Sequence, residues 1–332
     1  MLSREKPRRH DRRKEIRIMK IVYMGTPEFA VATLEALIKA GHEIVGVVTM
    51  PDKPAGRGQK MTMSAVKEYA VGKGLRVLQP EKLKDESFVE ELRSLGAELQ
   101  VVVAFRMLPE VVWSMPKYGT MNIHASLLPN YRGAAPINWA VINGEKKTGV
   151  TSFLLKHDID TGDIIASKEI DILPTDNAGT VHDKLMMLGA ELAVESIAQI
   201  ESGTAEMKRQ DDIDPDTLKK APKIFKDDMR IDWGKSSESV VNLIRGLSPY
   251  PAAWTILTDV KGKEYQTKVF AAEKVEGVSL SAGEVSATSK TLTVGTGDGA
   301  VRLTELQLSG KTKMKTEVML QGFHIDSSIR LK

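Results

Sequence analysis

Residues 20–50 read KIVYMGTPEFAVATLEALIKAGHEIVGVVTM, and this stretch decides the fold. Residues 20–25 form an apolar run, residues 27–41 carry apolar side chains at helical spacing and end at a glycine, and residues 43–50 are apolar again. A strand, a helix and a second strand in this order are typical of a parallel sheet with crossover helices. We therefore predict an α/β fold for the first part of the chain.

The same alternation continues further along the chain. Helical periodicity covers residues 64–74 and 85–96, and apolar runs follow at 75–80 and 98–105. Near-continuous apolar strands separated by amphipathic helices indicate a sheet that is covered on both faces. The predicted fold class is an open, mostly parallel sheet of the Rossmann type.

Two glycine-containing turns could suggest nucleotide binding, and neither fits. The first turn, MGTPEFA at 24–30, has one glycine, whereas a dinucleotide fingerprint needs several so that the pyrophosphate can approach the backbone. The loop PAGRGQKM at 54–61 lacks the spacing of a phosphate loop, and Met61 rather than Ser or Thr follows Lys60. We expect no nucleotide cofactor.

The residue composition and the pattern of apolar runs change towards the C-terminus. A long helix is predicted over residues 181–203, and the polar segment after it has the character of a connector. Beyond residue 250, short runs rich in Val and Thr alternate with glycines and predict a small β-barrel, similar to an OB fold. We predict a first domain over residues 19–207, a linker over residues 208–224 and a second domain over residues 225–332.

Composition limits the chemistry and the location of the protein. The 332 residues include no cysteine, which excludes disulfides, thiolate nucleophiles and cysteine-ligated metal sites. No run approaches the roughly 18 apolar residues of a membrane span, so we expect no membrane partner and a cytoplasmic location.

Charge is divided unevenly along the chain. Residues 1–18 carry eight Lys or Arg against three Asp or Glu, residues 19–218 carry a net charge of −7, and residues 219–332 a net charge of +5. A polyanionic partner is therefore predicted for the C-terminal part, where the candidate contacts are Lys223, Lys226, Arg245, Lys311, Lys313 and Lys315. Residues 1–18 lack the apolar segment of a secretory signal; we expect a disordered leader, with a basic nucleic-acid-binding arm as the alternative.

A polar pair interrupts an apolar strand in TMNIHASLLPNYRGAAPINWA, residues 120–140. Asn122 and His124 stand at alternate positions, so a strand would point both side chains to one face. Histidine is the side chain most often suited to proton transfer near neutral pH, so His124 fits that role, and the amide of Asn122 can donate to a developing negative charge. Either residue taken alone could instead be structural.

The residues after this strand carry a family resemblance. Asn122 and His124 are followed by Ser126, Leu127, Leu128 and Pro129, and Asp160 lies in an Asp-Thr-Gly motif 36 residues after His124. This arrangement resembles the 10-formyltetrahydrofolate-dependent formyltransferases. The resemblance implies that Asn122, His124 and Asp160 transfer a formyl group from 10-formyltetrahydrofolate to an amine without a metal. Whether Asp160 orients the imidazole, stabilises its cation or receives a proton through water stays open.

Further motifs occur in the order of the branch of this family that formylates initiator methionyl-tRNA. They are GTPEFA at 25–30, PDKPAGRGQK at 51–60, DTGDII at 160–165 and KIFKDDMRIDW at 223–233. The resemblance implies a role in translation initiation, and we expect a monomer. It also implies tRNA contacts by Lys53, Arg57 and Lys60, and folate contacts by residues 126–129 and by Phe105, Arg106, Met107 and Leu108.

Two alternative functions remain at this point. The first is a folate-dependent transferase for a small amine such as an amino-sugar nucleotide, which the basic second domain and the loop at 50–61 disfavour. The second is a non-catalytic RNA-binding relic, which the intact Asn122, His124 and Asp160 disfavour. His157 and Asp158 are possible loop supports, and Arg132 is either an anion site or structural.

Overall fold

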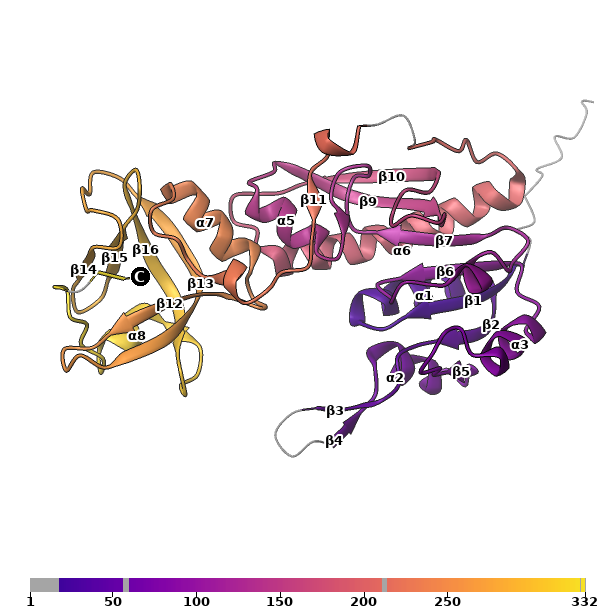
Figure 1. The fold of residues 1–332 in the computed structure, drawn as a ribbon, viewed down its shortest axis with the longest axis horizontal. Helices are drawn as coiled ribbons and strands as arrows, with labels where there is room; N and C mark the ends of the chain where they lie inside the picture. Colours follow the sequence, from indigo (N-terminus) through magenta and orange to yellow (C-terminus); the bar gives the residue numbers. More distant parts are fainter. Residues whose placement is uncertain (1–17, 56–59, 211–213, 329, 332) are drawn as a thin grey trace, which may run out of the picture.

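The computed structural model describes residues 18–55, 60–210, 214–328 and 330–331. The chain forms two lobes side by side, with helices α5 (Pro136–Ile142) and α7 (Ser237–Gly246) at the junction (Figure 1). The N-terminal lobe contains a layered α/β sheet, and the C-terminal lobe contains a curled antiparallel sheet. No helix in these described ranges is long and apolar enough to cross a membrane.

The N-terminal sheet has seven strands in the order β10-β9-β7-β6-β1-β2-β5. The five strands from β7 to β5 run parallel, and β9 and β10 add an antiparallel edge. The strands are β1 (Lys20–Gly25), β2 (Glu43–Val48), β5 (Val77–Leu78), β6 (Leu99–Val103), β7 (Thr120–His124), β9 (Lys147–Leu154) and β10 (Ile164–Asp171). The predicted Rossmann-like, mostly parallel sheet is confirmed.

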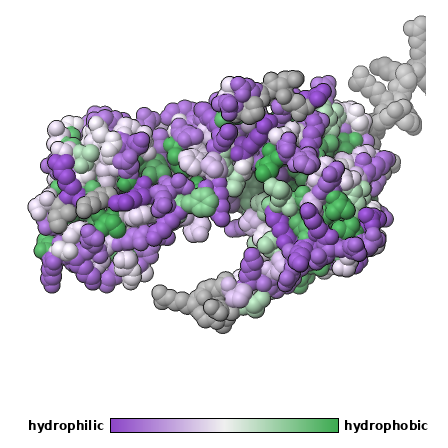
Figure 2. Space-filling model, in the orientation of Figure 1, coloured by the Kyte–Doolittle hydropathy of each residue, from purple (hydrophilic) through white to green (hydrophobic). Residues whose placement is uncertain are grey.

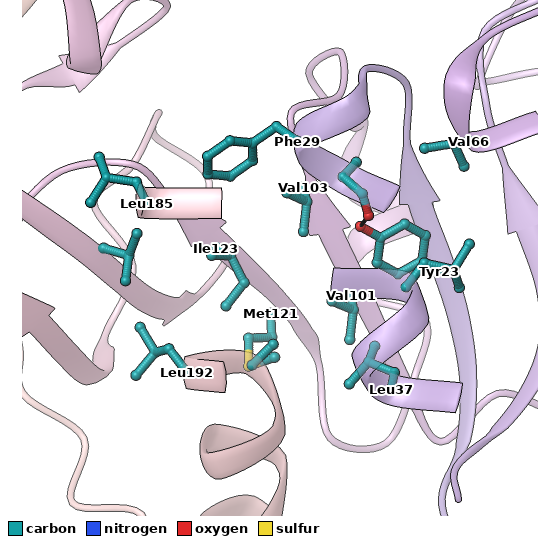
Figure 3. Close-up of a cluster of buried hydrophobic side chains, with 14 of the residues drawn as sticks. Tyr23, Phe29, Leu37, Val66, Val101, Val103, Met121, Ile123, Leu185 and Leu192 are labelled. Atoms are coloured by element: carbon teal, nitrogen blue, oxygen red, sulfur yellow. Dashed lines mark hydrogen bonds between the residues drawn. The ribbon is translucent and has the colours of Figure 1, made fainter. Parts of the chain in front are cut away.

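Helices cover both faces of this sheet and bury its apolar side chains. On one face, α1 (Glu28–Lys39), α2 (Ala65–Gly72) and α6 (Ala178–Ser202) contribute to a single hydrophobic cluster, which α6 builds with Leu185 and Leu192 against Met121 and Ile123 of β7 (Figure 3). On the other face, α3 (Glu86–Ser94) and α4 (Glu110–Trp113) cover a second cluster. The apolar face of β7 is therefore fixed in the core, which leaves its polar face for the site.

Helix α6 begins three residues before the predicted start and ends as predicted. The Asn177 side chain caps its N-terminus by accepting a hydrogen bond from the Thr180 backbone N–H at 2.9 Å, and the Thr180 hydroxyl oxygen accepts one from the Asn177 N–H at 3.0 Å. This capping box uses Asn and Thr rather than the more easily recognised Ser or Thr with Glu. At the other end Gly203 adopts a φ of 66°, the left-handed conformation that glycine tolerates best.

The C-terminal lobe is a six-stranded antiparallel sheet that curls into half a barrel. Its core contains Trp233, Leu257, Leu303 and other buried apolar side chains, and α7 packs on β13 and β16. The prediction of a small C-terminal β-domain is confirmed. The strands and the last helix are β12 (Ala253–Thr258), β13 (Glu264–Val275), β14 (Val285–Ala287), β15 (Leu292–Gly295), β16 (Ala300–Leu308), β17 (Met314–Lys315) and α8 (Thr316–Leu320).

Residues 214–230, which we call the connector, lie along the N-terminal lobe before they enter the C-terminal one. Strand β11 (Lys220–Ala221) pairs in parallel with β8 (Arg132–Gly133), which directly follows Tyr131, the residue whose carbonyl contacts His124 of β7. Two short 3-10 turns, η1 (Pro215–Thr217) and η2 (Asp227–Met229), flank this pairing. The connector therefore packs on the N-terminal lobe at residues 219–222, whereas Ile224 and Met229 already pack on the core of the C-terminal lobe. The predicted domain boundaries themselves stay a prediction.

The two lobes are joined by specific hydrogen bonds. The Asn138 side chain donates to the Gly246 carbonyl at 2.8 Å, and the Arg245 guanidinium donates to the Asp176 carbonyl at 3.1 Å. Within α7, the same guanidinium donates to the Asn242 side chain at 2.8 Å. Burial lowers the pKa of Arg245. The sequence predicts that Arg245 contacts a polyanion; the structure places this half-buried residue at the lobe junction, and the contact itself stays a prediction.

A hairpin of β3 (Lys53–Ala55) and β4 (Lys60–Thr62) projects from the N-terminal lobe (Figure 1). The surface is hollowed between the two lobes, and this hairpin stands at one edge of the hollow (Figure 2). Lys53 is exposed on β3. Arg57 and the side chain of Lys60 lie outside the described part of the structure.

Candidate active site

A cleft of about 640 Å³ lies at the carboxyl ends of β6 and β7. This is the edge of an open α/β sheet at which ligands bind most often. Asn122, His124 and Asp160 all line it, together with residues 104–108 after β6 and residues 133–138 at the start of α5. The structure thus brings together three polar residues that are separated by up to 38 positions in the sequence.

His124 is held by one of its ring nitrogens. Its Nε2 lies 2.9 Å from the Tyr131 carbonyl oxygen, which can only accept a hydrogen bond, so Nε2 carries the proton. In the neutral ring Nδ1 is then the unprotonated nitrogen. Nδ1 lies 3.9 Å from Asp160 Oδ2, and the His124 side chain is only 9% exposed. The unprotonated Nδ1 therefore faces the Asp160 carboxylate at a distance too long for a hydrogen bond between them.

Asp160 is fixed in a turn that the sequence does not reveal. Its φ is 56°, an uncommon conformation for a residue other than glycine, and its Oδ2 accepts a hydrogen bond from the Gly133 N–H at 3.0 Å. The Gln210 side chain donates to the carbonyls of Asp160 and Gly162, at 3.2 Å and 2.6 Å. The bond from Gly133, at the cleft, and those from Gln210, outside it, together hold the carboxylate near His124.

Glycine is required in the Asp-Thr-Gly turn for a separate reason. A Cβ atom added at Gly162 would lie 1.6 Å from the Leu154 carbonyl oxygen of β9, far closer than any real contact. The turn can therefore pass close to β9 only with glycine at this position.

Asn122 completes the polar face of β7. It is half-buried and lines the cleft, while its strand neighbours Met121 and Ile123 are 0% and 2% exposed in the core. The prediction that positions 122 and 124 share a face is confirmed. The cleft thus offers an amide donor, an unprotonated imidazole nitrogen and a carboxylate, between apolar walls that include Phe105, Trp113 and Leu155.

The comparisons with known proteins agree with this arrangement. The family model described as "Formyl transferase" matches residues 19–197, and the one described as "Formyl transferase, C-terminal domain" matches residues 223–324. The chain belongs to the formyl transferase family. Asn122, His124 and Asp160 all fall inside the first matched range.

Relatives within this formyl transferase family cover nearly the whole chain. A methionyl-tRNA formyltransferase of Bacteroides fragilis is 52% identical over 317 residues, which are 95% of this chain and 98% of that protein. One of Parabacteroides distasonis is 53% identical over 310 residues, 92% of this chain and 96% of the relative. Both lobes and the connector are therefore shared with these formyl transferases.

Solved structures show the same fold at lower identity. HypX from Aquifex aeolicus in complex with tetrahydrofolic acid is 20% identical with a TM-score of 0.62, covering 93% of this chain and 49% of HypX. WlaRD, a sugar 3N-formyl transferase, is 19% identical with a TM-score of 0.62, covering 89% of this chain and all of that one. These likenesses concern the formyl transferase fold alone.

One of the two predicted folate segments lines the cleft. Phe105, Arg106, Met107 and Leu108 all border it, and Met107 is 72% exposed. The Arg106 guanidinium donates to the carbonyl of Glu81 at 2.7 Å and to that of Pro80, and burial lowers its pKa. Arg106 therefore anchors this wall through its side chain and borders the cleft.

The other predicted folate segment, residues 126–129, does not line this cleft. None of residues 126–129 is among the cleft-lining residues of the described structure. Ser126 is fully buried and donates to the Asn130 carbonyl at 2.8 Å, and Leu128 packs with Phe153 and Ile164. The Leu128 N–H donates to the Thr151 hydroxyl at 3.1 Å. These contacts give Ser126 and Leu128 a packing role, Leu127 and Pro129 are half-exposed, and folate binding by residues 126–129 stays a prediction.

Several residues at the site were missed or left open by the sequence analysis. Tyr131 and Gln210 hold His124 and the Asp160 loop, while Phe29 and His182 line the cleft from α1 and α6. The role of Tyr131 depends on its backbone carbonyl, for which the sequence contains no signal. Arg132, left open between two roles, donates to the Gln210 side chain at 2.9 Å, a contact that supports the structural role.

Two further polar residues, His157 and Asp158, border the cleft. Their side chains are 87% and 82% exposed and pair with each other at 3.5 Å.

Within the described ranges, no cluster of three or more His, Asp or Glu side chains could hold a metal ion.

Proposed function

We propose that this protein transfers the formyl group of 10-formyltetrahydrofolate to the α-amine of methionyl initiator tRNA, as a step of translation initiation. The observation that carries the proposal is the convergence of Asn122, His124 and Asp160 on one cleft, in a chain that is 52% identical to a methionyl-tRNA formyltransferase over 95% of its length. We further propose that the protein is a cytoplasmic monomer. Its proposed parts are a first domain over residues 19–207, a linker over 208–224 and a second domain over 225–332.

The reaction forms one carbon–nitrogen bond and breaks another. The neutral amine attacks the formyl carbon, and the electron pair of the carbonyl moves to oxygen in a tetrahedral intermediate. The bond to N10 of folate then breaks as the carbonyl re-forms, and N10 takes a proton while the attacking nitrogen loses one. No net proton is produced, so one side chain can serve both transfers.

His124 Nδ1 is suited to carry that proton. Nε2 is occupied by the Tyr131 carbonyl, so Nδ1 accepts the proton from the attacking nitrogen and returns it to N10. The protonated ring gains a favourable interaction with Asp160, 3.9 Å away and mostly shielded from water. Asn122 donates to the oxygen on which negative charge develops. The geometry favours stabilisation of the imidazolium as the role of Asp160.

The walls of the cleft suit a flat ring system. Residues 105–108 border it with backbone groups and apolar side chains at the open end of β6. This position supports the proposal that they receive the pterin of the folate donor. The donor is a substrate here, and we propose neither a metal nor a nucleotide cofactor for the reaction.

The placement of positive charge supports a tRNA substrate. The hairpin of β3 and β4 stands at one edge of the hollow between the lobes, and Lys53 is exposed on it (Figure 2). The C-terminal part carries a net charge of +5 against −7 for residues 19–218. Contacts of lysines with phosphates would position the RNA without reading its sequence. We propose that Lys53, Arg57 and Lys60 guide the acceptor end towards the cleft.

A transfer assay with competing amines tests the proposed substrate. The purified protein is given 10-formyltetrahydrofolate with charged initiator tRNA, charged elongator tRNA or an amino-sugar nucleotide, and each product is measured in single turnovers. We expect rapid formylation of the initiator tRNA alone. Faster formylation of the sugar nucleotide would favour the small-amine function, and no transfer to any amine would favour an RNA-binding relic.

The same assay tests the basic hairpin through Arg57→Ala. We expect a larger loss of rate with initiator tRNA than of general RNA affinity, because the residue would deliver the acceptor end to His124. Lys39→Ala is a control, since Lys39 pairs with Glu35 on α1. Equal losses on initiator and elongator tRNA would reduce Arg57 to an ordinary phosphate contact.

A further inference from the structure

Tyr131 has a conformation that joins the catalytic histidine to the interior of the N-terminal lobe. Its φ is 62°, which is unusual for a bulky residue and persists only where the surroundings hold it. In this conformation its carbonyl accepts from His124 Nε2, while its side chain, in a residue only 6% exposed, runs into the core. One residue thus faces His124 with its backbone and the interior with its phenol.

The phenol is held by two polar side chains that follow α5. The Tyr131 hydroxyl donates to Glu145 Oε1 at 2.5 Å, and the Asn143 amide donates to the phenol oxygen at 3.2 Å. Burial, together with the hydrogen bond to Glu145, raises the pKa of Tyr131 well above its usual value. The phenol therefore stays protonated and keeps donating to Glu145 across the working pH range.

Lys219 of the connector closes this network on its far side. Its ammonium pairs with Glu145, its carbonyl accepts from the Tyr131 N–H at 2.6 Å, and its own N–H donates to the Asn130 side chain at 3.1 Å. Burial opposes ionisation of Glu145, but the hydrogen bonds from Lys219 and Tyr131 prevail and lower its pKa. Lys219 therefore holds the loop of residues 130–131 directly and also through Glu145.

None of these three side chains is placed to touch a substrate. Tyr131, Glu145 and Lys219 are absent from the lining of the cleft in the described structure, whereas His124 is part of it. Their common effect is on the loop that presents the Tyr131 carbonyl. Because that carbonyl decides which nitrogen of His124 carries the proton, a change in the loop would alter the basic nitrogen without altering a substrate contact.

We propose that Tyr131, held by Glu145 and Lys219, is a positioning residue that fixes the ring of His124 with Nδ1 as its basic nitrogen. The connector takes part in this positioning through Lys219, so the segment that leads to the C-terminal lobe also sets the geometry of the catalytic histidine. The kinetic consequence rests on the proposed formyl transfer, whereas the tautomer of His124 is a property of the unliganded protein.

The first experiment determines which ring nitrogen of His124 carries the proton, and it needs no substrate. Histidine rings of the full chain are isotope-labelled, and the nitrogen NMR signals of His124 are assigned by their loss in His124→Gln. We expect the proton on Nε2 in the parent protein and a mixture of tautomers in Tyr131→Phe. Tyr69→Phe is the matched control, because Tyr69 also packs against the same core from α2 but is not part of the network. A parent protein with the proton on Nδ1, or a Tyr131→Phe spectrum like that of the parent, would overturn the proposal.

The second experiment separates positioning from stability and from binding. In Tyr131→Phe and Glu145→Gln we expect kcat to fall roughly tenfold, with KM for both substrates within about twofold and the acidic limb of the pH–rate profile moved to lower pH. The double variant should lose little more than either single one, because the two side chains act as one unit. Lys219→Arg, which keeps the cation, should retain most of the activity.

The outcomes distinguish this proposal from the proposed function. An increase in KM with an unchanged pH profile, or an equal loss of kcat in Tyr69→Phe, would show that Tyr131 is merely structural. If the parent protein formylates no amine while the tautomer shifts as expected, the proposed function fails and the positioning of His124 stands.

Discussion

The cleft and the outer surface of the C-terminal lobe present charge in opposite ways. In the cleft, the His124 and Asp160 side chains are 9% and 11% exposed, and backbone groups hold both. On the C-terminal lobe, Lys313 is 45% exposed and Arg302 41% exposed, and each pairs with a glutamate. Buried, fixed groups act strongly at one point, while exposed charges act weakly and in sum.

The difference teaches where specific substitutions should matter. A side chain in the cleft cannot be replaced by a neighbour, because one specific backbone group holds it in place: the Tyr131 carbonyl for His124 and the Gly133 N–H for Asp160. A lysine on the outer surface is one of many cations and can be replaced by its neighbours. The following predictions test this contrast, beginning with the largest effect.

Replacement of His124 should nearly abolish turnover. In His124→Ala the proton of the attacking amine has no acceptor, so we expect kcat to fall by about a hundredfold or more while the affinity for the folate donor changes little. Single-turnover rates and equilibrium folate binding measure the two quantities. His324→Ala, an exposed histidine in the C-terminal lobe, is the control. A near-normal rate in a folded His124→Ala protein would contradict the mechanism.

Neutralisation of Asp160 should have the next largest effect. Asp160→Asn keeps an oxygen for the Gly133 N–H but removes the charge that stabilises the protonated imidazole. We expect kcat to fall roughly tenfold to a hundredfold, with the acidic limb of the pH–rate profile moved to lower pH. A loss of rate without any change in the profile would assign Asp160 to loop structure instead.

Removal of exposed lysines should weaken RNA binding only in combination. We expect the fourfold change of Lys223, Lys226, Lys311 and Lys315 to Gln to reduce affinity for initiator and elongator tRNA alike and to flatten its salt dependence, by about 0.9 in logarithmic slope for each phosphate that is no longer neutralised. The same change at four exposed lysines of the N-terminal lobe, Lys73, Lys82, Lys84 and Lys117, is the control. An equal effect of both sets would make net charge alone responsible.

Deletion of residues 1–18 should have no measurable effect. Residues 1–17 lie outside the described structure, Ile18 is 64% exposed, and the first core side chain is Met19, which is 0% exposed. Thermal stability, formylation rate and tRNA affinity should all match those of the full chain. A strongly reduced tRNA affinity would support the alternative of a basic nucleic-acid-binding arm.

The sequence predicts the parts of the site that depend on periodicity. Alternation along 120–124 places Asn122 and His124 on one face, because every strand has the same period of two. It does not predict the contact of Gln210 with the Asp160 loop, which spans 50 positions and depends on the path of the chain between them. The buried packing of Ser126 and Leu128 is hidden for the same reason, since the motif identifies a loop but not the direction it faces.

The pairing of β11 with β8 has a consequence for the order in which a ribosome makes the protein. The three proposed catalytic side chains have all been synthesised once residue 160 is added, yet the Tyr131 N–H donates to the carbonyl of Lys219 and the Asp160 carbonyl accepts from Gln210, both of which come later in the chain. Domains generally fold as units during synthesis, with the N-terminal one first. The hydrogen bonds that support the Tyr131 loop and the Asp160 turn from behind can therefore form only after residues 210–219 have left the exit tunnel.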